Sequence, residues 1–184
     1  FKLRHIYVFS IKKLMKSKKN LVFLGMMGSG KSSIGLLVAK RLKINFIDID
    51  SEIEKKLNTK IKKIFENKGE DYFRKIEEQI TLEHLKLQST VISLGGGAFV
   101  NKNIRQEIIK NHLSFWLSWD TKTLLNRIKN SKKRPLTIGA SDEELIYLMK
   151  KRSTSYSKAL YEIKCDKLSK IQVVNNIIKI YETN

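Results

Sequence analysis

The feature that most limits what this chain can fold into is a glycine-rich segment, Gly25-Met26-Met27-Gly28-Ser29-Gly30-Lys31-Ser32. It has the pattern G-x-x-x-x-G-K-[ST] of a P-loop. An apolar run at residues 21–24 precedes it, and a run with helical periodicity at residues 33–42 follows it. A strand, a glycine-rich turn and a helix in this order build a backbone cradle whose N–H groups bind phosphates. The segment therefore predicts a site for a nucleoside triphosphate with Mg²⁺.

Two side chains of this segment carry the expected chemistry. Lys31 is expected to reach the β- and γ-phosphates, and the Ser32 hydroxyl is expected to bind Mg²⁺. The candidate ATP-binding residues of the segment are Gly28, Ser29, Gly30, Lys31, Ser32 and Ser33.

The positive charge of the chain comes mostly from lysine. The sequence has 30 lysines and seven arginines among 184 residues, with a formal net charge of +19. Because the lysines occur in nearly every segment, we interpret them as solvated helix faces in preference to a nucleic-acid-binding patch. Arginine offers carboxylates and phosphates a planar fork that lysine lacks. Four arginines are therefore candidates for the site: Arg74, Arg127, Arg134 and Arg152.

The length and the hydrophobic content of 41% suit a single domain. No apolar run reaches the roughly 20 residues of a membrane span, and no export signal is recognisable, so we expect a cytoplasmic protein that binds no membrane. One cysteine, Cys165, excludes an internal disulfide. We expect residues 1–19 to be a basic N-terminal extension, disordered or non-native, with Met15 as the natural start. Residues 20–184 are expected to form the domain.

Apolar runs and helical patterns alternate along the domain. Strands are expected at residues 21–24, 44–50, 90–94, 113–117 and 161–165. Helices are expected at residues 33–42, 51–57, 60–67, 70–87, 102–111, 121–130, 142–160 and 171–181. This alternation predicts an α/β fold in which helices flank a five-stranded parallel sheet.

Three signals fall at the carboxyl ends of the expected strands, where open parallel sheets bind ligands. The P-loop follows the first strand, Asp48 and Asp50 end the second, and Gly95-Gly96-Gly97 follows the third. Side chains alternate along a strand, so Asp48 and Asp50 are expected to face one pocket while Ile49 faces the core. One carboxylate can then serve the metal, and the other can accept a proton from a substrate hydroxyl.

Simpler interpretations compete with these. Asp50 suits the N-cap of the next helix equally well, and three glycines also make an ordinary flexible turn. Arg74 has glutamates at helical spacing that favour surface ion pairs: Glu70, Glu77 and Glu78.

Two further features are interpreted from their surroundings. Arg134-Pro135 lies in a polar loop long enough to form a lid that keeps water from the γ-phosphate. Trp116 and Trp119 are interpreted as packing residues of the core and its rim, in preference to a ligand platform.

The order of the motifs resembles shikimate kinase over residues 20–182. The motifs are the P-loop, Asp48-Ile49-Asp50, Phe73-Arg74-Lys75-Ile76-Glu77, Leu94-Gly95-Gly96-Gly97-Ala98, Arg134-Pro135-Leu136, and Lys151-Arg152 with Tyr156. The resemblance implies a three-layer P-loop kinase of the nucleoside-monophosphate-kinase-like fold, with a lid and a substrate-binding helical region. It implies transfer of the γ-phosphate of ATP to the 3-hydroxyl of shikimate in chorismate biosynthesis. ATP is then the co-substrate, Mg²⁺ the cofactor, and a monomer without a specific nucleic-acid partner is expected.

The resemblance also implies individual roles. The catalytic residues would be Lys31, Asp50 and Arg134. Ser32 and Asp48 would hold Mg²⁺, Asp48 through a water molecule. Arg127 and Arg134 would contact ATP. The residues expected to bind shikimate are Asp50, Arg74, Gly95, Gly96, Gly97 and Arg152.

Two other functions remain open from the residues alone. One is a related small-molecule kinase whose acceptor is gluconate or a nucleoside monophosphate. The other is a nucleotide-dependent binding or regulatory protein that uses its positive charge on nucleic acid.

Overall fold

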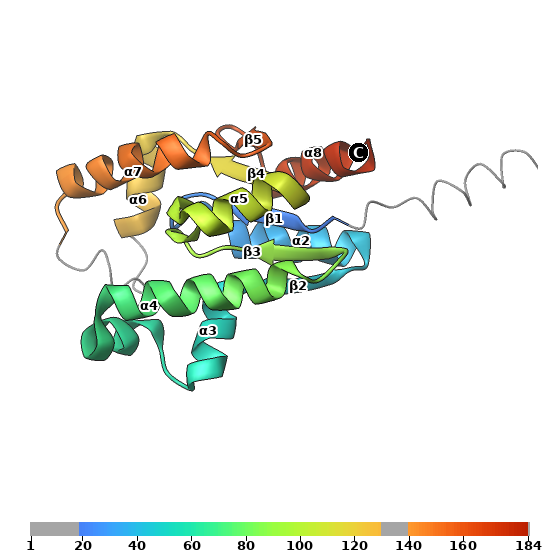
Figure 1. Ribbon diagram of the computed structural model, residues 1–184. Coiled ribbons are helices and arrows are strands. Elements are labelled where there is room, and N and C mark those ends of the chain that lie inside the picture. Colours follow the sequence, from blue (N-terminus) through green and yellow to red (C-terminus); the bar gives the residue numbers. More distant parts are fainter. Residues whose placement is uncertain (1–18, 130–139, 184) are drawn as a thin grey trace, which may run out of the picture.

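Five parallel strands form the centre of the computed structural model, which describes residues 19–129 and 140–183. The strands are β1 (Leu21–Leu24), β2 (Asn45–Asp48), β3 (Thr90–Ser93), β4 (Leu113–Ser118) and β5 (Tyr161–Lys164). Their spatial order is β2-β3-β1-β4-β5, and every neighbouring pair is parallel (Figure 1). The predicted five-stranded parallel sheet is confirmed.

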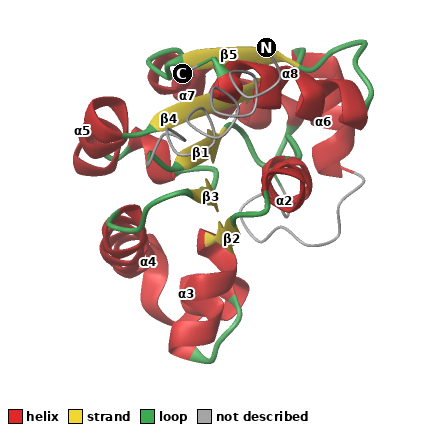
Figure 2. Cartoon of the chain, turned by 90° about the vertical axis from the view of Figure 1, so that its right-hand side faces the viewer, coloured by secondary structure: helices red, strands yellow, loops and turns green. Residues whose placement is uncertain are grey.

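Helices cover both faces of this sheet. They are α2 (Lys31–Leu42), α3 (Ile49–Leu57), α4 (Ile61–Leu85), the 3₁₀ helix η1 (Ala98–Val100), α5 (Lys102–Asn111), α6 (Thr121–Lys129), α7 (Asp142–Tyr156) and α8 (Lys170–Glu182). Figure 2 shows α4 and α5 on one side of the strands and α2 on the other. The α8 helix packs against α2. The three-layer arrangement that the resemblance implied is therefore present.

The burial of both faces of the central strand β1 explains why residues 21–24 form a continuous apolar run. Val22 and Leu24 belong to a hydrophobic cluster with residues of α4 and α5, and Leu21 and Phe23 belong to a second cluster with residues of α2 and α8. All four side chains are buried. A strand of a parallel sheet that is covered on both faces has no polar side, so it shows no alternation of apolar and polar residues.

The second strand is shorter than predicted. It ends at Asp48, and helix α3 begins at Ile49, whereas the expected strand ran to residue 50 and the expected helix began at residue 51. The Asp48 side chain accepts a hydrogen bond from the backbone N–H of Ser51 at 3.3 Å, which makes Asp48 the N-cap. The interpretation of Asp50 as the cap was therefore wrong by two residues, because Asp50 lies in the first turn of the helix.

The helices expected at residues 60–67 and 70–87 join as α4, interrupted at Gly69. The backbone there has φ 78° and ψ 174°, a conformation that glycine tolerates and other residues avoid. The helix expected to run to residue 160 ends at Tyr156. The next residues turn toward β5, and the Leu160 N–H donates to Ser114 Oγ at 2.8 Å.

Asn20 links three segments at the amino end of β1. Its Nδ2 donates to the carbonyl oxygens of Leu85 at 3.1 Å and Leu87 at 2.6 Å, and its Oδ1 accepts from the Thr90 N–H at 3.1 Å. The side chain is fully buried. It therefore joins the start of β1 to the end of α4 and the start of β3.

Replacing Asn20 by alanine is expected to lower the free energy of unfolding by about 2–4 kcal/mol, because two buried backbone groups and one part-buried carbonyl lose their partner. Urea denaturation followed by circular dichroism measures this value. Asn111→Ala is the matched control, since that exposed amide donates to the side chain of Glu107; equal losses in both variants would contradict the linking role of Asn20.

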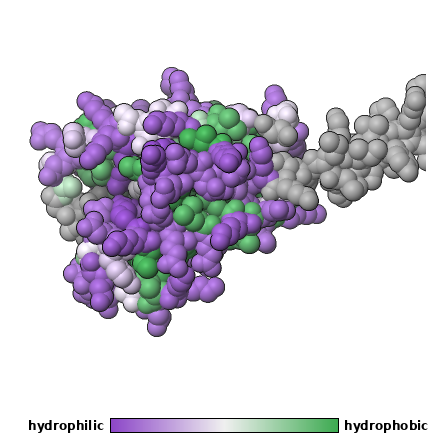
Figure 3. Space-filling model, in the orientation of Figure 1, coloured by the Kyte–Doolittle hydropathy of each residue, from purple (hydrophilic) through white to green (hydrophobic). Residues whose placement is uncertain are grey.

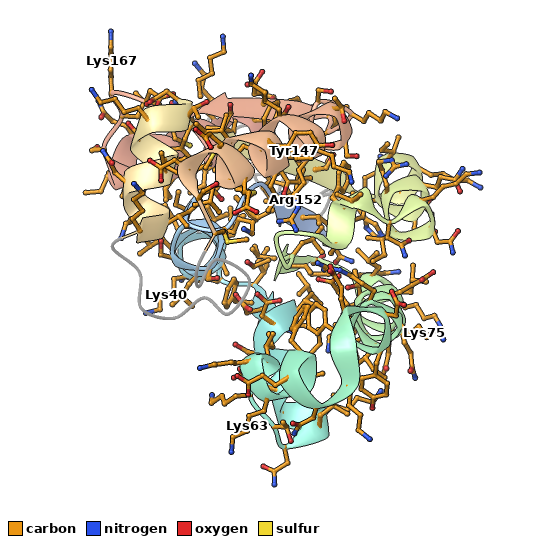
Figure 4. The ribbon with its side chains drawn as sticks, turned by 90° about the vertical axis from the view of Figure 1, so that its left-hand side faces the viewer. Lys40, Lys63, Lys75, Tyr147, Arg152 and Lys167 are labelled. Carbon is orange, nitrogen blue, oxygen red and sulfur yellow. The ribbon has the colours of Figure 1, made fainter. Side chains whose placement is uncertain are left out.

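Hydrophilic residues cover most of the face shown in Figure 3. Lys40, Lys63, Lys75 and Lys167 lie at the periphery in Figure 4, and all four are exposed. Their placement agrees with the interpretation of the lysines as solvated. Within residues 19–129 and 140–183, no helix is both long and apolar enough to cross a membrane. Residues 1–18 fall outside the described parts, so the expected extension and start remain predictions.

Candidate active site

The P-loop folds back over its own lysine. Lys31 Nζ donates to the carbonyl oxygens of Gly25 at 3.0 Å and Met26 at 3.1 Å, and the lysine is only 8% exposed. A Cβ on Gly25 would lie 2.9 Å from the Leu117 carbonyl oxygen, so the loop start requires glycine. Gly30 adopts a left-handed conformation directly before α2. The loop thus presents its backbone at a helix N-terminus, the arrangement that binds phosphates.

Hard oxygen ligands gather beside the loop, at the ends of β2 and β3. Ser32 Oγ lies 3.5 Å from Ser93 Oγ, and Asp48 is the register partner of Ser93. Among the described residues there is no group of three or more His, Cys, Asp or Glu side chains that could hold a metal. Mg²⁺ in phosphate-transfer sites uses one or two protein oxygens and completes its shell with phosphates and water. Ser32 and Asp48 fit that requirement.

Asp50 reaches the same site from α3, not from the end of a strand. Ile49 is fully buried, as expected. Asp50 lies in the first turn of a helix, so the alternation of side chains along a strand does not explain its position. A Cβ on Gly95 would lie 2.7 Å from Asp50 Oδ1, so this carboxylate faces the glycine backbone. Burial, Asp48 and Glu77 raise the pKa of Asp50 to about 7, against the opposing effect of Lys31 and Arg74. Such a carboxylate can take up a proton near neutral pH.

Arg74 lies between two glutamates of its own helix. It donates to Glu70 Oε1 from Nε at 3.0 Å and from Nη2 at 2.8 Å, and to Glu77 Oε2 from Nη1 at 2.6 Å. Glu77 is only 2% exposed, and its Oε1 has no hydrogen-bond partner among the described residues. Burial raises the pKa of Glu77 while Arg74 opposes that rise. The surface-pair interpretation therefore holds for Glu70 but is wrong for Glu77, and Glu78 bonds two asparagines near α5 instead.

The triple glycine brings the arginines close to the P-loop. A Cβ on Gly97 would lie 2.7 Å from Arg74 Cζ. A Cβ on Gly96 would lie 3.3 Å from the Met27 nitrogen and 3.5 Å from Arg152 Nη1. The glycines at positions 95–97 therefore lie in close contact with the site residues, and a side chain at Gly95 or Gly97 would displace Asp50, Glu77 or Arg74.

Arg152 comes to this place from α7. It is 8% exposed, and Figure 4 shows it in the interior, unlike the labelled lysines. One turn further along the helix, Tyr156 donates its hydroxyl to the Gly96 carbonyl oxygen. Burial raises the pKa of Tyr156 to about 12, although Arg152 opposes the shift. The phenol therefore stays protonated and keeps this hydrogen bond.

Arg127 joins the site beside the P-loop. Its Cζ lies 3.5 Å from the centroid of the Trp119 ring, and Trp119 Nε1 donates to the Ser29 carbonyl oxygen at 2.9 Å. Arg134 and Pro135, with the lid expected around them, lie outside the described residues.

Sequence reasoning missed two residues of this site, Glu77 and Trp119. Glu77 has a detectable signal, because it lies four residues after Phe73 and three before Ile80, and both of these are buried. A carboxylate at helical spacing between two core residues indicates a buried charge. Trp119 has no comparable signal, since its hydrogen-bond acceptor is a backbone carbonyl 90 residues away in the sequence.

Carboxylates and arginines around a P-loop at the end of the central strand define a P-loop kinase. The sequence profile of the shikimate kinase family matches residues 27–182. The shikimate kinase of Bartonella quintana is 39% identical over 180 residues, covering 96% of this chain and 86% of the relative. This chain belongs to the shikimate kinase family, as the motif order predicted.

Solved structures agree with this assignment. A shikimate kinase from Acinetobacter baumannii in complex with shikimate has a TM-score of 0.86 at 28% identity, covering 94% of this chain and 98% of that one. The shikimate kinase of Aquifex aeolicus has a TM-score of 0.80 at 34% identity, covering 90% of this chain and 97% of that one. The chain is thus an ATP-dependent kinase, the family uses Mg²⁺, and the regulatory alternative loses its support.

Proposed function

We propose that this chain transfers the γ-phosphate of ATP to the 3-hydroxyl of shikimate, giving shikimate 3-phosphate and ADP, through the residues described above. The observation that carries the proposal is the convergence of Asp50, Arg74 and Arg152 on the triple glycine beside the P-loop. A compact acceptor with one carboxylate and several hydroxyls matches two guanidinium groups and one carboxylate base.

On the nucleotide side, the N–H groups of residues 28–33 and the Lys31 ammonium would bind the phosphates. Arg127 would contact ATP beside Trp119, and Arg134 would contact it from the lid. Ser32 would hold Mg²⁺ directly and Asp48 through water. When bound, the metal neutralises charge on the phosphates. Catalysis then rests mainly on position and electrostatics.

On the acceptor side, Arg74 and Arg152 would bind the shikimate carboxylate and ring, together with the backbone at Gly96. Asp50 would accept the proton of the 3-hydroxyl while that oxygen bonds to the γ-phosphorus. The bond from the γ-phosphorus to the bridging oxygen breaks, and ADP leaves with that electron pair. The pKa of about 7 allows Asp50 to accept this proton near neutral pH.

We also propose that the protein acts as a monomer in the cytoplasm. The contacts of Asp50, Arg74 and Glu77 with the triple glycine form within one chain, which supports a monomer. Its co-substrate ATP is abundant in the cytoplasm.

The test is ADP release from MgATP by the purified protein, with shikimate, gluconate or a nucleoside monophosphate as acceptor. Release that depends on shikimate and not on the others supports the proposal. Equal release with gluconate, or ATP binding without release on any acceptor, would overturn it.

A substitution at Gly97 separates the two substrates. Alanine is compatible with the backbone there, where φ is −102°, but its methyl group would displace the Arg74 guanidinium. We expect Gly97→Ala to raise the KM for shikimate by about tenfold or more, as for loss of a charged hydrogen bond, with the KM for ATP unchanged. Steady-state kinetics with each substrate varied in turn measures both KM values. A rise in the KM for ATP alone would contradict the role of Arg74 in binding shikimate.

A further inference from the structure

Trp119 lies where the two halves of the hydrophobic core meet the nucleotide side of the sheet. It directly follows β4, and it is partly buried against both hydrophobic clusters. Rim packing, the role expected from the sequence, accounts for this burial. It does not account for the two directed contacts that the indole makes, one through its N–H and one through its face.

The first contact is to the P-loop. Trp119 Nε1 donates to the Ser29 carbonyl oxygen at 2.9 Å. Lys31 bonds the carbonyls of Gly25 and Met26 at the start of the loop, and the indole bonds the loop three residues after Met26. Ser29 stands between Gly28 and Gly30, whose φ angles of 83° and 92° belong to flexible glycine conformations. A side-chain anchor at this point limits the orientations of the phosphate-binding N–H groups that follow.

The second contact is to Arg127. The guanidinium carbon lies 3.5 Å from the centroid of the indole ring, in a stacked cation–π arrangement. Arg127 is an exposed residue on α6, and a long exposed side chain has many rotamers. Stacking on a fixed ring selects one plane for the guanidinium before any nucleotide arrives.

We propose that Trp119 is a positioning residue of the nucleotide site: its N–H fixes the P-loop at Ser29, and its ring fixes the plane of Arg127. The proposal rests on the proposed function, in which the loop and Arg127 bind ATP. A residue that only filled the rim would need neither a donor directed at the loop nor a cation on its face. The acceptor side of the site has no contact with this indole among the hydrogen bonds and ring contacts described.

Two variants separate the two contacts. Trp119→Phe keeps a ring beneath Arg127 and removes the N–H, whereas Trp119→Leu removes both. Calorimetric titration with MgADP measures affinity without requiring phosphoryl transfer. We expect the Kd to rise about threefold to tenfold in Trp119→Phe, as for one lost hydrogen bond. Trp119→Leu should add a further factor of about two to five for the lost stacking.

A double-mutant cycle assigns the second factor to Arg127. In an Arg127→Met background, Trp119→Leu should weaken MgADP binding no more than Trp119→Phe does, because the cation is already gone. The KM for shikimate should stay within about twofold of the original in every Trp119 variant. Trp116→Phe is the matched control, since the Trp116 ring faces Tyr156 at 6.0 Å, and MgADP affinity should be unchanged.

Fluorescence gives an independent readout. The sequence has two tryptophans, so Trp116→Phe leaves Trp119 as the sole emitter and Trp119→Phe leaves Trp116. MgADP should change the emission of Trp119 and leave that of Trp116 nearly constant. Unchanged MgADP affinity in both Trp119 variants, or an equal loss of affinity for shikimate and nucleotide, would mean that Trp119 has only a packing role. If the original protein failed to bind MgADP at all, the proposed function would fall with it.

Discussion

Asparagine in place of Asp50 is expected to lower kcat by about two to four orders of magnitude, the usual contribution of a general base, while the Kd for MgATP changes little. The amide has nearly the shape of the carboxylate and can still hydrogen-bond a hydroxyl, but it cannot accept the proton of that hydroxyl. Asp50 also faces Gly95, on the acceptor side of the P-loop. The loss should therefore fall on turnover, measured by shikimate-dependent ADP release at saturating substrates.

Asp71→Asn is the matched control, because Asp71 is an exposed carboxylate on α4, the helix that carries Arg74. Its kcat should equal that of the original protein. Near-normal turnover in Asp50→Asn would remove this residue from proton transfer and leave it as a hydrogen-bonding group only.

The same substitution is expected to stabilise the protein when no ligand is bound. Burial, Asp48 and Glu77 raise the pKa of Asp50 from 3.8 to about 7 in the folded state. Well below pH 3.8 the carboxyl is neutral in both states and costs nothing. As the pH rises toward 7, only the unfolded state can ionise freely, so stability is progressively lost. Thermal unfolding in EDTA should therefore show a higher Tm for Asp50→Asn at pH 8 and a much smaller difference at pH 4.

The opposite pattern, with asparagine destabilising at pH 8, would mean that the ionised Asp50 is well accommodated. An enzyme that retains a carboxylate at a cost in stability is an expected compromise at an active site.

The sequence was sufficient for the parts of the fold that depend on local pattern. β1 reads as a strand because both of its faces are buried, and α5 was predicted at its observed bounds, residues 102–111. The P-loop was located because its glycines, lysine and serine are consecutive. In each of these segments, neighbouring residues contain all the information required.

The sequence was insufficient where the outcome depends on a single hydrogen bond or on the packing of residues that lie far apart in the sequence. The cap bond at Asp48 ends β2 two residues before the predicted end. The prediction that Asp48 and Asp50 share a side of a strand was therefore based on the wrong secondary structure. The glycines at 95–97 were weak signals alone, because the contact of Gly97 with Arg74 becomes visible only when α4 packs beside the loop after β3. Burial of Glu77 required the same packing.

Removing the P-loop lysine should impair both nucleotide binding and turnover, whereas removing the base should impair turnover alone. Lys31→Ala is expected to reduce shikimate-dependent ADP release by about a thousandfold or more, because it deletes a charge preorganised for the transferring phosphate. It also leaves the carbonyls of Gly25 and Met26 without the ammonium that holds them. Unlike Asp50→Asn, it should therefore weaken MgATP binding as well as turnover.

The residual activity of Lys31→Ala should have a shifted pH dependence. The Lys31 ammonium lowers the pKa of Asp50, so its loss should raise that pKa further and move the activity to higher pH. Lys40→Ala is the matched control, because Lys40 is an exposed lysine in the last turn of the same helix, α2. Rates and MgATP affinity measured from pH 6 to 9 give the comparison. If Lys31→Ala kept MgATP affinity and an unshifted profile, its ammonium would be only a structural tie within the loop, and the phosphates would have to be bound by the backbone alone.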